Sequence, residues 1–352
     1  MKATALGPST VGRIALLFAC LFTGCNKNNT RAVLLIADAG NGRIVQTDNF
    51  NGAGWTAFSY PRVNTNLISP VAVAVDSMGR IYAVNTADYN ITRMDDITGK
   101  GLVTFGGHGS GPGQFSGPFG MVIDAQDHIY VADADNDRIV RMDGIDGSGW
   151  TSLGQHGSGP SEFDEPVDVA IDSKGRIYVG DRQNGRIVRI DDMTGAGWTS
   201  YGQRGSSVGP GVFDLIAGVS VGAAGRIYVT DANENVVIAF DDMTGTGYTS
   251  FGYIAANSLF KQPAGIFVNG EATQIYVASE NNDHVAYFED MQGTSKLGQN
   301  PRTSAPAATS RHGVRCTVRW ACPRSKTESG ELASRNLTAI FLRRKQCPPR
   351  SL

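Results

Sequence analysis

The segment Gly175-Arg176-Ile177-Tyr178-Val179-Gly180-Asp181 is one copy of a motif that recurs along this chain. Each later copy places isoleucine before tyrosine and small or branched apolar residues after it. The tyrosine position is occupied in turn by Leu35 (in a divergent first copy), Tyr82, Tyr130, Tyr178, Tyr228 and Tyr276. Successive positions lie 47, 48, 48, 50 and 48 residues apart. The chain therefore contains six tandem copies of one structural unit.

Each full copy contains four short runs typical of β-strands, separated by turn residues. Helical periodicity is missing, and 44 of the 352 residues are glycine, which favours many tight turns. In the fourth copy the runs cover residues 166–172, 176–181, 186–191 and 198–201. Four strands in a repeat of this length are the signature of a β-propeller blade.

The repeats resemble the NHL repeat. The resemblance rests on Phe-x-x-Pro-x-Gly, then Asp-x-x-Gly-x-Ile-Tyr-Val-x-Asp, then Asn-x-Arg-Ile, and it is closest over 115–143 and 163–191. It implies an all-β fold, a six-bladed β-propeller of four-stranded blades, over residues 33–296. The first copy has no room for its first strand between the N-terminal segment and Val33. The last copy loses the pattern after Gly293, so ring closure requires the tail or stays imperfect.

The N-terminal segment has the features of an export signal. Lys2 and Arg13 precede nine apolar residues, 14–22, which at 1.5 Å each are too short to cross a hydrocarbon core of ~30 Å. The following Thr23-Gly24-Cys25 resembles a bacterial lipobox. We therefore predict a signal over 1–25, a lipidated Cys25 and a tether over 26–32. The alternative is an ordinary cleaved signal with a chance cysteine. The protein is then exported, and its lipid anchor is its only membrane contact.

The formal net charge of −2 conceals three unlike segments, the first of which, residues 1–30, carries 3 basic and no acidic side chains. Residues 31–296 carry 17 basic and 31 acidic side chains, which argues against a nucleic-acid partner. Residues 297–352 carry 11 basic and 2 acidic side chains and no repeat. This basic tail has three interpretations: a disordered or non-native end, an interaction segment, or an element that closes the ring.

Several recurring polar and aromatic residues have structural explanations. Asp133, Asp181 and Asp231 end the second strand of their copies, where a carboxylate accepts backbone N–H groups of the turn. Arg138 and Arg186 are placed to pair with two of these carboxylates. A set of aromatic residues shares another repeat position, where packing within the blades is favoured over stacking on a ligand: Trp55, Trp150, Trp198 and Tyr248.

The candidate ligand-facing residues lie in the loops between copies. His108 and His156 occupy the same place in Gly-Gly-His-Gly-Ser-Gly-Pro and Gly-Gln-His-Gly-Ser-Gly-Pro, and the next copy has Arg204 there. Some NHL-like propellers are zinc-dependent lyases that use three histidines from different blades. Here the third histidine is missing. We therefore expect no metal site, no cofactor and no catalytic residue.

Two classes of function fit these observations. The favoured one is a non-catalytic, monomeric binding or scaffold protein at the bacterial cell envelope. It would bind a protein, peptide or carbohydrate through its loops. The alternative is a metal-dependent hydrolase or lyase with its site at the central channel, which needs acidic or histidine side chains converging from several blades. The fold does not decide between them.

Overall fold

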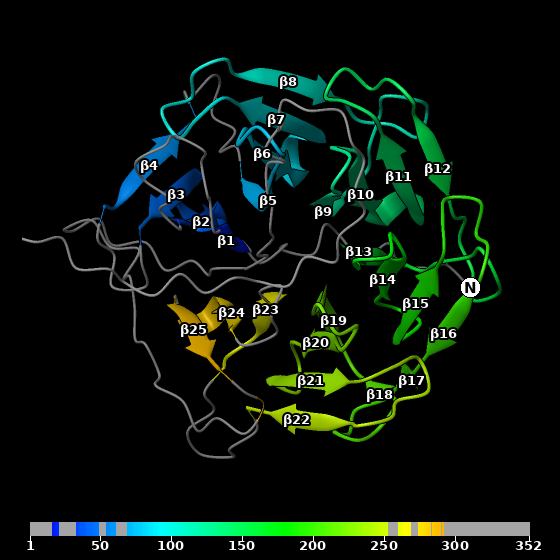
Figure 1. The fold of residues 1–352 in the computed structure, drawn as a ribbon. Coiled ribbons are helices and arrows are strands. Elements are labelled where there is room, and N and C mark those ends of the chain that lie inside the picture. The colour runs from blue at the N-terminus through cyan, green and yellow to red at the C-terminus, as the bar shows by residue number, and fades with distance from the viewer. Residues whose placement is uncertain are drawn as a thin grey trace, which may run out of the picture.

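A computed structural model of the chain describes residues 16–20, 33–48, 54–60, 69–252, 260–268, 274–282, 284–289 and 291. These residues form six antiparallel sheets arranged radially about one axis, with the first strand of each sheet innermost (Figure 1). The predicted six-bladed β-propeller is confirmed. Among the residues described, no helix has the length and apolar character needed to cross a membrane.

Each blade runs outward in chain order. The strands of the first three blades are β1 (Leu16–Cys20), β2 (Val33–Asp38), β3 (Arg43–Thr47), β4 (Thr56–Ser59); β5 (Pro70–Val75), β6 (Ile81–Asn85), β7 (Asn90–Met94), β8 (Val103–Gly106); and β9 (Pro118–Ile123), β10 (Ile129–Asp133), β11 (Arg138–Met142), β12 (Thr151–Leu153). Those of the last three are β13 (Pro166–Ile171), β14 (Ile177–Asp181), β15 (Arg186–Ile190), β16 (Thr199–Tyr201); β19 (Ile216–Val221), β20 (Ile227–Asp231), β21 (Val236–Phe240), β22 (Thr249–Phe251); and β23 (Pro263–Val268), β24 (Ile275–Ser279), β25 (His284–Phe288). A short parallel pair, β17 (Gln203–Arg204) and β18 (Val212–Phe213), connects the fourth and fifth blades.

Burial changes from the axis outward in a way that explains the sequence pattern. All five residues of β14 are buried, because both faces of the second strand lie against neighbouring blades. In β15 only two arginines are partly exposed, and in β16 no residue is buried. In the fourth blade the apolar Ile-Tyr-Val motif is therefore the sequence of the strand with least access to water.

Aromatic residues fill the space between successive blades. Phe115 and Phe163 are fully buried. Their ring centroids lie 5.4 Å from Trp150 and 5.3 Å from Trp198, respectively. These two tryptophans therefore pack within the protein, as predicted, and each also lies beneath an arginine guanidinium.

The ring closes through a strand that the sequence analysis did not predict. Leu16–Cys20 forms β1 and pairs antiparallel with β2, with Leu16 opposite Ala37 and Cys20 opposite Val33. The prediction that the first copy lacks its innermost strand was wrong, because the apolar run supplies that strand. β1 lies beside both β5 and β23, so the innermost strands form a complete ring. The sixth blade has three strands among the residues described.

The predicted export signal concerns processing of the chain and stays a prediction. Cys25, the tether over 26–32 and the basic tail over 297–352 lie outside the described residues.

Candidate functional site

One end of the propeller carries both the connections between blades and the turns between second and third strands. We call this the loop face, and define it as the connections 107–117, 155–165 and 203–215 with the turns 134–137, 182–185 and 232–235. Contacts join the two kinds of segment, because the backbone N–H of Asp164 donates to Asp181 at the end of β14. The same contact joins Ser116 to Asp133 and Asp214 to Asp231.

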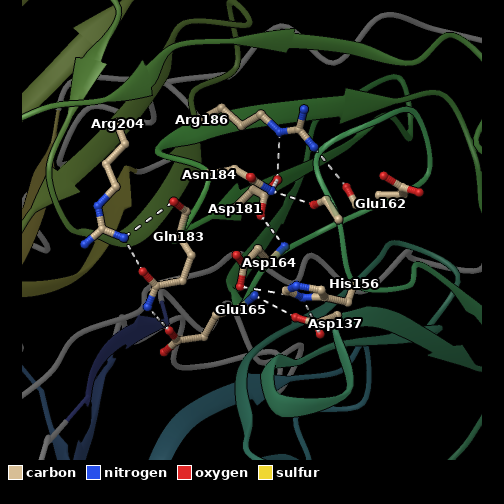
Figure 2. Close-up of polar contacts among 11 residues, drawn as sticks. Asp137, His156, Glu162, Asp164, Glu165, Asp181, Gln183, Asn184, Arg186 and Arg204 are labelled. Atoms are coloured by element: carbon tan, nitrogen blue, oxygen red, sulfur yellow. Dashed lines mark hydrogen bonds and ion pairs between the residues drawn. The ribbon is translucent and has the colours of Figure 1, made fainter. Parts of the chain in front are cut away.

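A buried carboxylate anchors each connection. Asp181 accepts hydrogen bonds from Asn184 at 3.0 Å and from Arg186 Nε at 2.7 Å (Figure 2). Arg186 and Asn184 also donate to backbone carbonyls of the connection: Ser158, Glu162 and Gly157. Burial raises the pKa of the Asp181 carboxyl, and these hydrogen bonds oppose the shift. The predicted pairing of Asp181 with Arg186 is confirmed.

The third blade repeats this network. Asp133 accepts from Asn136 and from Arg138 Nε, both at 2.8 Å. Arg138 and Asn136 donate to carbonyls of the preceding connection: Ser110, Gln114 and Gly109. Burial again raises the pKa of Asp133. Two successive connections are therefore held by the same internal hydrogen bonds.

His156 lies at the exposed edge of the connection from the third to the fourth blade. Its side chain is 72% exposed, and its Nδ1 lies 3.2 Å from Asp137 Oδ2 and 3.9 Å from Asp164 Oδ1 (Figure 2). Asp137 has a left-handed backbone conformation with φ of 52°, and its Oδ1 accepts the backbone N–H of Glu165 at 2.8 Å. Three side chains with metal-binding atoms thus converge here.

His108 and Arg204 occupy the corresponding positions in neighbouring connections but have different partners. The His108 ring lies 4.4 Å, centroid to centroid, from Tyr89. Arg204 donates a hydrogen bond to the Gln183 side chain and passes close to Gly185. Tyr89 and Gly185 are the left-handed residues of their turns, as Asp137 is of its own. The structure shows no contact between any two of the three candidates, so they line one face without forming one cluster.

A buried arginine lies behind the loop face. Arg182 Nη1 is 2.6 Å from Glu165 Oε1, and its Nε donates to the Ile216 carbonyl in the fifth blade. Its guanidinium lies over Phe119 of the third blade, 5.5 Å from the ring centroid. Arg182 therefore joins three blades. Burial lowers the pKa of Arg182, and the Glu165 carboxylate opposes that shift. Among the described residues, the Nη2 atom has no hydrogen-bond partner.

Four of these residues were not identified as site residues from the sequence: Asp137, Asp164, Glu165 and Arg182. The sequence did mark Arg182 as unusual, because a long charged side chain stands where three other copies have alanine: Ala39, Ala134 and Ala232. No comparable signal exists for Asp137 and Asp164. They approach His156 only because the connection folds back onto the turn.

Comparison with known proteins places the chain among propellers. The model of the NHL repeat matches residues 163–190. A catalytically inactive virginiamycin B lyase from Staphylococcus aureus, solved with quinupristin, is 15% identical, with a TM-score of 0.53 and coverage of 83% of this chain and 86% of that one. Hydrazine synthase from Kuenenia stuttgartiensis is 13% identical, with a TM-score of 0.55 and coverage of 84% of each chain.

A nidogen/laminin complex gives 16% identity, a TM-score of 0.55 and coverage of 73% of this chain and 88% of that one. No curated protein sequence matches. At these identities the shared feature is the fold alone. The chain is thus a six-bladed β-propeller in which residues 163–190 match the NHL repeat.

Proposed function

We propose that this propeller is a non-catalytic binding protein that takes a protein or peptide partner on its loop face. One observation carries the proposal: the third and fourth blades hold their connections by the same buried network, and each of these connections exposes a histidine above it, His108 and His156. The exposed positions carry His108, His156 and Arg204 in successive connections. Polar side chains exposed on an ordered support are the arrangement expected of a recognition surface.

The buried hydrogen-bond network also lowers the conformational entropy that the loops lose when a partner binds. Arg186 alone spans from the buried Asp181 to the carbonyls of Ser158 and Glu162, so the connection is held in one conformation. A loop that is already ordered loses less conformational entropy when a partner binds. Of the partner classes expected from sequence, a protein has further support, because the fold occurs in a complex of nidogen with laminin. The carbohydrate partner and the metal-dependent enzyme stay predictions.

Binding can be tested with a random peptide library displayed on phage and selected on the full chain. Synthetic copies of the enriched peptides are then titrated against wild type and against a His108→Ala/His156→Ala/Arg204→Ala variant. We expect the dissociation constant of the variant to be about tenfold higher or more, because side chains central to an interface carry most of its binding energy. The control is Lys100→Ala/Lys174→Ala, two exposed positions in turns at the opposite end of the blades. Failure to enrich any peptide, or equal weakening by the control, contradicts the proposal.

We also propose that the protein is exported and anchored to a bacterial membrane by a lipid on Cys25. The support is the lipobox-like Thr23-Gly24-Cys25 after an apolar run. Processing at Cys25 would remove β1, so the mature protein would then need another strand beside β2. Labelling of cells with a clickable fatty acid tests the anchor, and equal labelling of wild type and Cys25→Ala rejects it.

A further inference from the structure

We propose that Asp137, His156 and Asp164 form a binding site for one divalent transition-metal ion of the zinc type. The site lies between the third and fourth blades on the loop face, and the proposal does not depend on the proposed function. In the part of the chain that the structure describes, these residues are the one group of three potential ligands whose binding atoms all lie within 4.8 Å of one another.

The distances between these atoms match those of a metal centre. Zinc bound at about 2.1 Å by nitrogen and oxygen in a tetrahedron holds its ligand atoms about 3.4 Å apart. His156 Nδ1 lies 3.2 Å from Asp137 Oδ2 and 3.9 Å from Asp164 Oδ1. The oxygens of Asp137 and Asp164 lie within 4.8 Å of each other. Side-chain rotations that bring the two carboxylates closer to His156 therefore place all three atoms at bonding distance of one ion.

The backbone positions all three side chains before any ion binds. His156 pairs with Phe163 in an isolated parallel bridge, which brings the neighbouring Asp164 to the same end of the connection. The backbone N–H of Asp164 is held by Asp181, at 2.8 Å. Asp137 Oδ1 is held by the backbone N–H of Glu165, so its Oδ2 is turned toward His156. Ordered ligands of this kind favour binding, because little conformational entropy remains to be lost.

The ligand set selects the type of ion. An imidazole nitrogen with two carboxylates suits zinc and its neighbours, whereas calcium and magnesium prefer oxygen ligands alone. Two carboxylates also balance the charge of a divalent cation. Three protein ligands leave a fourth position for water or for an atom of a partner. His156 is 72% exposed, so that position faces solvent.

The connections beside neighbouring blades lack this combination of one histidine and two carboxylates. The second blade has Tyr89, His108 and Ser116 at the three corresponding positions, and the fourth blade has Gly185, Arg204 and Asp214. His108 forms the same bridge, to Phe115, without any carboxylate beside it from these positions. The chain thus contains its own matched control for the effect of a loop histidine.

The test is isothermal titration of the full chain with Zn²⁺ at pH 7, with the three cysteines of the tail replaced by serine in wild type and variants alike so that their thiols bind no metal: Cys316→Ser, Cys322→Ser and Cys347→Ser. We expect one saturable ion per chain. His156→Ala should raise the dissociation constant about tenfold or more, since loss of even an outer partner of a metal ligand costs about that much. Asp137→Asn should weaken binding similarly. It keeps the hydrogen bond to Glu165, as Asn235 keeps the equivalent one to Gln262.

His108→Ala should leave the dissociation constant unchanged, and thermal melting of all variants should match wild type because the substituted side chains are partly or largely exposed. Absence of saturable binding shows a histidine–carboxylate ion pair only and overturns the proposal. So does equal weakening by His108→Ala and His156→Ala, or unaltered binding in His156→Ala.

Discussion

Arg186 Nε lies 2.7 Å from the Asp181 carboxylate, which is fully buried, and the same pair recurs in two other blades. The Arg138–Asp133 distance is 2.8 Å and the Arg43–Asp38 distance is 2.7 Å. The fifth blade has Val236 in place of the arginine, and its Asp231 still accepts the backbone N–H of Asp214. In the third, fourth and fifth blades the carboxylate is thus the common anchor of the connection, and in the third and fourth the arginine also binds carbonyls of the exposed part of the loop.

Arg186→Ala should lower the free energy of unfolding by about 3 kcal/mol, because it leaves a buried carboxylate without its counter-ion. The side chains are 11% and 0% exposed, so water screens the pair little. Arg186→Lys should restore only part of the loss, since lysine does not reproduce the contacts to both Asp181 and the loop carbonyls. Urea unfolding measures both. Lys174→Ala, an exposed position in the same blade, should change stability by less than about 0.5 kcal/mol. Full recovery of stability in Arg186→Lys would contradict the claim that residue 186 must contact the Asp181 carboxylate and the loop carbonyls at the same time.

The repeat tyrosines predict a loss of stability at alkaline pH. Burial, with help from the Asp172 carboxylate, raises the pKa of Tyr178 to about 12 from an ordinary value of 10.0. The folded protein therefore holds the phenol proton above pH 10, where the unfolded chain releases it. Stability from this group is fully present below pH 10 and is lost as the pH rises toward 12. Urea midpoints between pH 9 and pH 11.5 should fall less steeply for Tyr178→Phe than for wild type, and identical slopes would contradict the shift.

Gly185 occupies the left-handed position of its turn in the fourth blade, and a side chain there should destabilise the protein. Gly185 has φ of 62°, and a Cβ there would overlap the backbone of Arg204. Gly185→Ala should therefore lower the melting temperature more than Gly175→Ala does. The control position also has a positive φ, 83°, but a Cβ there would meet nothing within 4 Å. Gly175→Ala should cost about 1 kcal/mol from backbone strain alone, and Gly185→Ala about 1–3 kcal/mol more. Equal losses of stability in the two variants would mean that the backbone at Arg204 moves away from the new Cβ atom at no cost.

The two members of the Arg182–Glu165 pair should respond unequally to removal. Glu165 is 29% exposed and keeps Gln183 as a partner, whereas the Arg182 side chain is 9% exposed. Glu165→Ala leaves a buried cation without its carboxylate and should cost about 3 kcal/mol. Arg182→Met leaves a hydrated carboxylate and should cost less than about 1.5 kcal/mol. In urea unfolding, the double variant should lose about as much stability as Arg182→Met does. A larger loss in Arg182→Met than in Glu165→Ala would contradict this prediction.

The regular part of the fold could be predicted because its causes are local. Within one copy, alternating apolar residues and turn residues such as Gln183-Asn184-Gly185 specify strands and hairpins without reference to the other copies. The pairing of Asp181 with Arg186 was predictable for the same reason, since a short turn brings residues five positions apart face to face.

The N-terminal strand shows where this reasoning stops. Residues 14–22 are apolar, a composition that suits both an export signal and the innermost strand of a propeller blade, as the buried β5 shows. The sequence supported only the first interpretation, because the partner of the strand, β2, lies beyond a polar segment. The three candidate loop residues were correctly grouped by repeat position, but their partners were not foreseen.

The repeat by itself determined the number of blades, the strand order within each blade and the buried face of each strand, because these depend on contacts within one copy of about 48 residues. Only the tertiary structure decided that β1 completes the ring, that Arg182 is enclosed by three blades, and that Asp137 and Asp164 lie beside His156. Those relationships join different blades or a loop to a turn, and their distances depend on how far each connection folds back over the strands beneath it.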